Sequence, residues 1–125
     1  MQYINFIRDI DEDRGLGRRY LPLAGSPLAD TPPASLDPGY ARAHPEEFGA
    51  FVRHHLGYYE RWQREAEKGF RYIPRRCRIP IKTASDMYNW TARRIAADPM
   101  VVFERKVKPS RGRILARILR NAVGG

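Results

Sequence analysis

Apolar residues recur along most of the chain at the three- and four-residue spacing of amphipathic helices. The first such run is short and begins at the N-terminus. Its apolar positions share one helix face: Tyr3, Phe6, Ile7 and Ile10. The pattern predicts a helix that continues to about Arg14 and is stopped by Gly15 and Gly17, because glycine is favoured just past helix ends.

A second, longer amphipathic run begins near Pro45 and continues to about Lys68, where Gly69 is predicted to end it. Its apolar stripe consists of Phe48, Phe51, Val52, His55, Tyr59, Trp62 and Ala66. His54 and His55 are adjacent and point to different faces, so they cannot form a metal pair on one face. We therefore expect each to be a satisfied core or boundary histidine.

Two more helices are predicted in the C-terminal half. One begins between Pro74 and Pro80 and ends before Pro99. Its buried stripe is Ile81, Ala84, Tyr88, Ala92 and Ile95. The last helix is capped by Ser110. Its apolar face is Ile114, Leu115, Ile118, Leu119 and Ala122.

The segments between these helices lack helical periodicity. Residues 21–45 are rich in proline and glycine, which predicts a long irregular connection with one short helical turn near Tyr40. The segment from Met100 to Val107 has strand propensity, but it has no second strand to pair with, so we expect an extended connection. The predicted fold class is therefore all-α.

The N-terminal helix also carries polar side chains on one face. Asn5, Asp9 and Asp13 are spaced one helical turn apart, and Gln2 and Glu12 flank them. Carboxylates one turn apart repel each other, and a bridging Mg²⁺ ion would relieve that repulsion, since it accepts one or two carboxylates together with substrate phosphates. The alternative is a solvated acidic helix end, which is common for an isolated pair at this spacing.

A longer set of fixed positions distinguishes this segment from an isolated acidic pair. It reads Asn5-x-x-Arg8-Asp9-x-x-Glu12-Asp13 and continues as Gly17-Arg18-Arg19-Tyr20-Leu21-Pro22. The pattern resembles the second aspartate-rich motif of squalene and phytoene synthases, which is close to N-x-x-R-D-x-x-E-D followed by G-R-x-Y-L-P. Residues 72–123 resemble the archaeal-type phytoene synthases most, through Ile81-Lys82-Thr83-Ala84, Met87-Tyr88-Asn89-Trp90 and Val101-Val102-Phe103-Glu104-Arg105-Lys106-Val107.

The resemblance implies the C-terminal part of the class I isoprenoid synthase helical fold, as one helical region over residues 1–125. It implies a head-to-head condensation of two prenyl diphosphates in isoprenoid biosynthesis, such as geranylgeranyl diphosphate to the carotenoid precursor phytoene. In such a reaction, metal ions and basic groups neutralise the leaving diphosphate, and a dry apolar cavity protects the allylic cation from water. The implied cofactor is Mg²⁺, with Mn²⁺ as the alternative ion.

The resemblance also implies a role for each matching residue. The implied metal ligands, counted among the catalytic residues, are Asp9 and Asp13. The implied catalytic tyrosines are Tyr20 and Tyr88. The implied substrate-binding residues are Gln2, Asn5, Arg18 and Arg105. Gln2, Asn5 and Glu12 would support the cluster of metal ion and diphosphate. Two of these positions have simpler interpretations, because Tyr88 lies on a predicted core stripe and Arg105 could be a surface cation.

The chain departs from the family in one respect, because it has one aspartate-rich motif where the family has two on facing helices. We therefore expect a C-terminal fragment that is inactive alone and that could form homo-oligomers through exposed apolar faces. The alternative is a non-catalytic relative that binds diphosphate, lipid headgroups or a protein partner.

The charge of the chain favours anionic partners. It carries 23 Lys and Arg against 14 Asp and Glu, a net charge of +9. Prenyl diphosphate is the expected ligand, and peripheral membrane contact is the second expectation. Nucleic acid is not expected, because a nucleic-acid interface would leave Asp9 and Asp13 unexplained. The chain has no apolar run of membrane-spanning length, so the predicted location is the cytoplasm or the membrane periphery.

Overall fold

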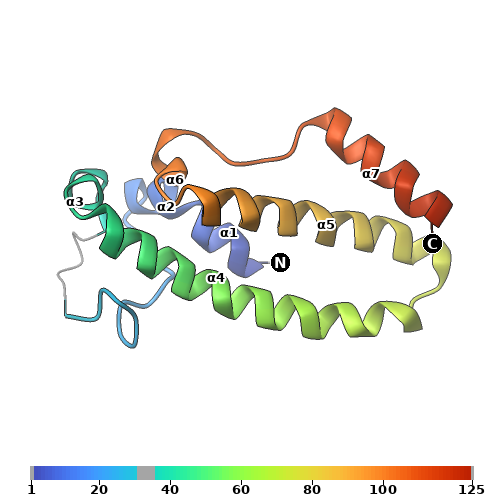
Figure 1. Ribbon diagram of the computed structural model, residues 1–125, viewed down its shortest axis with the longest axis horizontal. Coiled ribbons are helices and arrows are strands. Elements are labelled where there is room, and N and C mark those ends of the chain that lie inside the picture. The colour runs from blue at the N-terminus through green and yellow to red at the C-terminus, as the bar shows by residue number, and fades with distance from the viewer. Residues whose placement is uncertain (1, 31–35, 125) are drawn as a thin grey trace.

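Two long antiparallel helices form the body of the molecule in the computed structural model, which describes residues 2–30 and 36–124. Helix α4 (Pro45–Glu67) lies alongside α5 (Arg75–Ala97), and a short 3₁₀ helix, η2 (Lys68–Tyr72), follows α4 before the chain turns (Figure 1). No strand occurs within the described ranges, which confirms the predicted all-α fold.

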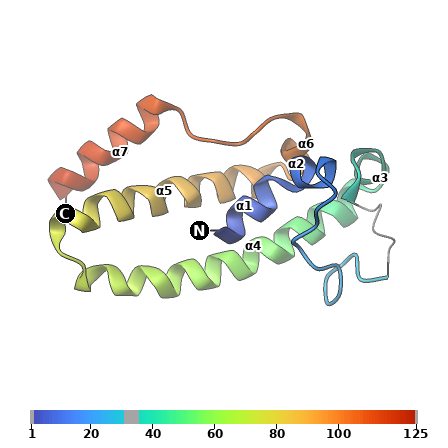
Figure 2. The same cartoon turned by 180° about the vertical axis from the view of Figure 1, so that it is seen from behind.

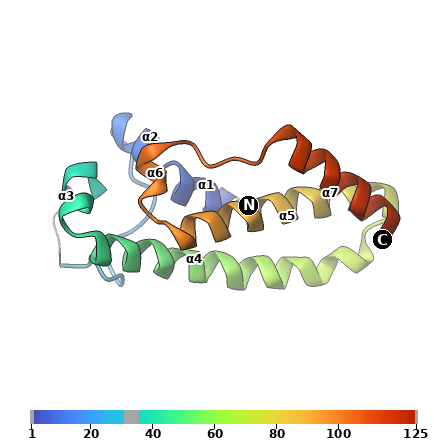
Figure 3. The ribbon, with the colours of Figure 1, turned by 45° about the horizontal axis from the view of Figure 1, so that its top comes forward.

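Helices α1 and α7 pack against this pair. Helix α1 (Gln2–Arg8) contacts both α4 and α5, as Figure 2 shows from the opposite side. It is followed by α2 (Ile10–Gly15). Helix α7 (Arg111–Gly124) lies along the outer side of α5 near the C-terminal end of the chain (Figure 3). The three substantial helices predicted after the N-terminal one are therefore present as α4, α5 and α7.

Aliphatic and aromatic side chains from α1, α4 and the end of α5 form one core. The fully buried members with the largest side chains include Ile4, Ile7, Phe48, Phe51, Tyr59 and Ile95. Each such side chain stabilises the fold by roughly 1.5–3 kcal/mol relative to an exposed position. None of the helices in the described ranges combines the length and the apolar character that a bilayer-crossing segment needs.

The N-terminal segment forms two helices where the sequence predicts one. The break lies at Asp9, whose amide still donates to the Asn5 carbonyl at 2.9 Å, while the Asp13 amide donates to the Asp9 carbonyl at 2.8 Å. The helical hydrogen bonds therefore continue through the break. Asn5, Asp9 and Asp13 keep the one-turn spacing that the sequence predicts.

A glycine cap ends α2. Gly17 has a φ of 71°, and its amide donates to the Arg14 carbonyl at 3.0 Å, while the Arg18 amide donates to the Asp13 carbonyl at 2.8 Å. This pair of bonds is the Schellman motif, which needs a residue in the left-handed region that glycine adopts without steric cost. The cap fixes Arg18 beside the last turn of the acidic segment. Gly15 lies inside α2, so it does not stop the helix as predicted.

Helix α4 ends at Glu67, one residue before the predicted Lys68, although the 3₁₀ helix η2 continues the helical path through Gly69 to Tyr72. The segment predicted to be extended from Met100 to Val107 contains a helical turn, α6 (Val101–Glu104), in which Val101 and Val102 are buried. Burial of these two side chains explains why their strand propensity does not decide the local conformation. The helical turn predicted near Tyr40 is α3 (Pro38–Ala43).

Three predicted apolar stripes are only partly buried. Trp62 and Ala66 are exposed, so the core side of α4 ends near Tyr59 and Gln63. In α5 the buried positions include Thr83 and Ser85, whereas Ile81, Ala84 and Tyr88 are half-buried. In α7 the exposed side chains include Leu115, Ile118 and Leu119, because this helix packs on α5 through the buried Asn121.

Candidate functional site

The carboxylate of Asp9 is held by two cations. Arg8 donates from Nε to one oxygen at 2.8 Å and from Nη2 to the other at 3.0 Å. Lys106 Nζ lies 3.9 Å from Asp9 Oδ1 and 3.2 Å from Glu12 Oε2. The acidic segment is therefore an ion-pair cluster to which the C-terminal half contributes a lysine.

The sequence prediction did not include Lys106 in the site. It chose Arg105, the preceding residue, and both cations line a recess of about 420 Å³ next to Trp90. No ion pair joins Arg105 to the acidic segment in the described part of the chain. Both cations belong to the segment that follows α6, and residue spacing cannot tell which of two neighbouring cations reaches the carboxylates.

Asp13 lies at the C-terminal end of the acidic face and is partly buried. Burial raises its pKa, and the nearby carboxylates of Asp9 and Glu12 raise it further, while Arg18 and Lys106 oppose the shift. A carboxylate under this repulsion gains from any additional cation placed next to it.

Arg18 and Tyr20 lie beside Asp13. The three residues line a cavity of about 170 Å³ together with Phe6. The Tyr20 ring stacks on the Phe6 ring with centroids 4.5 Å apart and planes 16° apart. The structure therefore brings together Asp13, Arg18 and Tyr20, three residues to which the resemblance assigns roles in the site.

Asn5 provides an unpaired oxygen on the same helix face. Its Oδ1 is buried and has no hydrogen-bond partner, the one such side-chain atom among residues 2–30 and 36–124. A buried acceptor without a partner costs roughly 1–3 kcal/mol, which a ligand or metal ion at this point would offset. Gln2 is exposed at the start of α1.

An apolar cavity of about 530 Å³ lies between α5 and α7. Its walls include Ala84, Met87, Tyr88, Ile114 and Ile118, and Arg8 also lines it. Tyr88 is therefore a half-buried wall residue of the cavity, although the sequence placed it on a core stripe. The hydrogen bond to Asp9 raises the pKa of Arg8, and the nearby Tyr88 raises it further. Arg8 thus joins the apolar cavity to the carboxylate cluster.

A buried histidine connects the segments on either side of the acidic cluster. His55 on α4 accepts a hydrogen bond at Nδ1 from the Tyr3 hydroxyl and donates from Nε2 to the Pro22 carbonyl at 3.2 Å. Burial lowers its pKa, which favours the neutral imidazole, and the Pro22 carbonyl, which can only accept, places the proton on Nε2. The predicted satisfied core histidine is confirmed for His55. Its link to α1 and to the chain after Tyr20 had no signal in the sequence.

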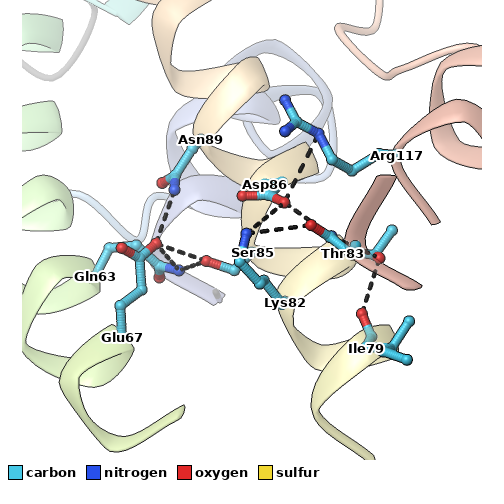
Figure 4. A network of polar contacts seen from close by, with 10 residues as sticks. Gln63, Glu67, Ile79, Lys82, Thr83, Ser85, Asp86, Asn89 and Arg117 are labelled. Atoms are coloured by element: carbon cyan, nitrogen blue, oxygen red, sulfur yellow. Dashed lines mark hydrogen bonds and ion pairs between the residues drawn. The ribbon is translucent and has the colours of Figure 1, made fainter. Parts of the chain in front are cut away.

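A second network of hydrogen bonds joins α4 to α5. Glu67 Oε1 accepts from Ser85 Oγ at 2.7 Å and from Asn89 Nδ2 at 2.9 Å, as Figure 4 shows. Asn89 in turn accepts from the Tyr59 hydroxyl at 2.9 Å, and burial raises the pKa of Tyr59 well above its usual range. These bonds fix the register of α5 at Tyr88, the neighbour of Asn89.

The described residues contain no group of three or more histidine, cysteine, aspartate or glutamate side chains arranged to hold a metal ion. Asp9 and Asp13 therefore supply two carboxylates on one face, supplemented by the Asn5 amide oxygen. Mg²⁺ is commonly held in this way when substrate phosphates complete its octahedral shell.

The comparisons with known proteins agree with the motif. A family model described as squalene/phytoene synthase matches residues 1–113, which is most of the 125-residue chain. The match includes the acidic segment, the two long helices and the start of α7. No curated protein and no solved structure gives a match.

Proposed function

The chain belongs to the squalene/phytoene synthase family, and from that premise we propose that it carries one half of a site for the head-to-head condensation of two prenyl diphosphates. We further propose that the reaction is of the phytoene synthase type, with geranylgeranyl diphosphate as substrate. The chain alone would bind the diphosphate without turning it over, because it has one aspartate-rich motif.

The position of Arg8 carries this proposal. Arg8 binds both oxygens of Asp9 and also lines the apolar cavity of about 530 Å³. A prenyl diphosphate has an anionic head and a long hydrocarbon tail, so it needs charged and apolar surfaces that adjoin each other. The carboxylate cluster would hold the anionic head and the apolar cavity would hold the tail, and the Arg8 side chain borders both.

The oxygen donors fit Mg²⁺ as an incomplete site. Asp9 and Asp13 are one turn apart, and the Asn5 Oδ1 atom is buried without a partner. Burial raises the pKa of Asp13, and its carboxylate neighbours raise it further. Two carboxylates and an amide are hard oxygen ligands of the type Mg²⁺ takes. When bound there, the ion would supply positive charge to the leaving diphosphate.

The remaining residues of the cluster have separate roles in this proposal. Arg18, beside Asp13, would donate to the diphosphate oxygens. Lys106 would exchange its contact with Glu12 for the diphosphate, since its ammonium group is a mobile point charge on a flexible stem. Tyr88 and the aliphatic wall residues would exclude water from the prenyl chain. Tyr20 would border the diphosphate from the Asp13 side.

Calorimetric titration of the chain with a non-ionisable thiolo-diphosphate analogue of geranylgeranyl diphosphate tests the proposal. Binding should require Mg²⁺ and weaken at least about ten-fold in Asp9→Asn with Asp13→Asn, because the cation bridge between enzyme and diphosphate is lost. Mg²⁺ without the analogue should bind weakly.

The matched control is Asp30→Asn with Glu65→Gln, which makes the same charge change at two exposed positions that line none of the cavities described above. Equal loss in both double variants would attribute the effect to net charge and contradict the site. Binding that needs no Mg²⁺ and follows only the basic residues would favour the non-catalytic relative that binds anions.

A further inference from the structure

Helix α7 is attached to α5 by polar groups. The buried Asn121 donates from Nδ2 to Thr83 Oγ1 at 3.1 Å and to Asp86 Oδ2 at 3.0 Å. Lys82 Nζ donates to Asn121 Oδ1 at 3.2 Å. Arg117 Nε lies 3.7 Å from the same Asp86 oxygen, and Figure 4 shows Lys82 and Arg117 meeting Asp86 at this contact. The bonds determine which side of α7 faces the body of the molecule.

The opposite side of α7 is aliphatic and faces solvent. Leu115, Leu119 and Val123 follow one another at four-residue spacing and are 60%, 61% and 87% exposed. Residues at this spacing lie on one face of a helix, so the three side chains form a continuous stripe more than two turns long. A soluble surface rarely leaves such a stripe uncovered.

The stripe lies in the most basic segment of the chain. From residue 105 to the C-terminus there is no acidic residue, and seven cations occur: Arg105, Lys106, Lys108, Arg111, Arg113, Arg117 and Arg120. Two of them are held by α5, since Arg113 lies over the Trp90 ring at 4.9 Å and Arg117 pairs with Asp86. Arg111 and Arg120 are exposed and lie within one turn of the stripe, before Leu115 and after Leu119.

We propose that α7 docks on an anionic lipid bilayer, with the Leu115, Leu119 and Val123 stripe inserted at the level of the headgroups. Helices that lie in the plane of a bilayer combine an aliphatic face with lysine and arginine at its borders. Arg111 and Arg120 would bind lipid phosphates, because guanidinium groups match phosphate geometry and are attracted by the negative surface potential.

The charge of the segment and its exposed leucines favour a lipid bilayer over a second copy of the chain or a nucleic acid. A second copy meeting the stripe through its own α7 would bring its exposed Arg111 and Arg120 close to those of the first copy, and these like charges repel. A nucleic acid would use the arginines but would leave the leucine side chains exposed. An anionic bilayer would bind the arginines through its phosphates and bury the aliphatic stripe among its headgroups and acyl chains.

Docking would also orient the apolar cavity. Ile114 and Ile118 belong to α7 and line the cavity between α5 and α7. A docked α7 would therefore hold the cavity mouth close to the bilayer, from which a prenyl chain can enter. The docking itself stands independently of the diphosphate site, because none of the stripe residues belongs to the carboxylate cluster.

Co-sedimentation of the whole chain with lipid vesicles tests the proposal. We expect binding to vesicles with about 30 mol% phosphatidylglycerol in phosphatidylcholine, and little binding to phosphatidylcholine alone. Leu115→Gln with Leu119→Gln should weaken binding by about ten-fold or more, because two aliphatic side chains no longer leave water. Arg111→Gln with Arg120→Gln should weaken it roughly five-fold for each arginine.

Matched controls distinguish an effect of the stripe from a nonspecific effect of losing any exposed leucine or any two positive charges. Leu16→Gln replaces a leucine that is 62% exposed outside α7, and Arg42→Gln with Arg64→Gln removes the same charge elsewhere. Both controls should bind vesicles as the unaltered chain does. Equal loss in the controls would overturn the proposal.

Three other results would also overturn the docking of α7 on lipid. One is vesicle binding that survives the double leucine replacement. Another is a leucine-dependent dimer in analytical ultracentrifugation that forms without lipid. The third is duplex RNA binding as tight as vesicle binding and insensitive to the leucine replacements. Far-ultraviolet circular dichroism of each variant confirms that its helices remain formed.

Discussion

His55→Phe should destabilise the protein in a manner that depends on pH. The substitution keeps an aromatic ring beside Phe51 but removes the hydrogen bonds to Tyr3 and Pro22. Each bond contributes about 0.5–1.5 kcal/mol, so the loss at neutral pH is about 1–3 kcal/mol. Pro22 is exposed and its carbonyl can be hydrated, so no further cost for an unpaired buried group is added.

The pH dependence follows from the lowered pKa of His55. Its ordinary value is 6.5, and burial is the main cause of the decrease, with the neighbouring His54 lowering the pKa further. A depressed histidine pKa contributes stability that is present above pH 6.5 and is lost as the pH falls, because the unfolded chain binds the proton first. One such histidine can lower the free energy of unfolding by at most about 2 kcal/mol between pH 6.5 and pH 5.

Urea unfolding followed by circular dichroism, between about pH 7.5 and pH 5, provides the measurement. The unfolding free energies of the two proteins should differ at neutral pH and converge as the pH falls, because only the unaltered chain has His55 to protonate. His44→Gln, at an exposed histidine, should give no such convergence. Two parallel curves would show that His55 titrates alike in the folded and unfolded chain, and the neutral bridge from Tyr3 to Pro22 would then be wrong.

Three further measurements test separate contacts of the molecule. Asn121→Leu removes hydrogen bonds between α7 and α5, so the backbone amides of α7 should exchange hydrogen about ten-fold faster or more. The amides of α4 should remain protected, and equal acceleration in both helices would contradict a local attachment of α7. Lys106→Met should raise the pKa of Asp13, followed by carbon-13 NMR of its carboxyl group, whereas Arg105→Met should leave it unchanged. The chain alone should yield no phytoene from labelled geranylgeranyl diphosphate and Mg²⁺, and product that disappears in Asp9→Asn would disprove this expectation.

The helices themselves could be predicted because their patterns are local. Proline at the first position of α4, the serine cap of α7 and the glycine after α2 act within a few residues of where they stand in the sequence. The serine contact is direct, since Ser110 Oγ accepts from the Arg113 amide at 3.2 Å. The one-turn spacing of Asn5, Asp9 and Asp13 is likewise local, and it survived the break at Asp9.

Burial of a helix face could not be predicted in the same way. Trp62 and Leu119 have the spacing of core residues, but each is 61% exposed, even though the Tyr3 ring of α1 meets the Trp62 ring edge-on. Thr83, Ser85 and Asn121 are polar and yet buried, because each finds a partner on another helix. Periodicity reports which residues share a face, whereas the packing partner decides whether that face leaves water.

The sequence by itself determined the helical fold, the family and the acidic face of the N-terminal helix, since helical periodicity and motif spacing can be read along the chain without knowing which segments pack together. Only the tertiary structure decided that Lys106 reaches Asp9 and Glu12, that Arg8 borders the apolar cavity, and that His55 links α1 to the chain after the motif. The hydrogen bonds and ion pairs among those contacts join residues from 33 positions apart, for His55 and Pro22, to 97 positions apart, for Lys106 and Asp9. Their formation depends on how α1, α4, α5 and the segment after α6 pack together, and that packing is a property of the whole core.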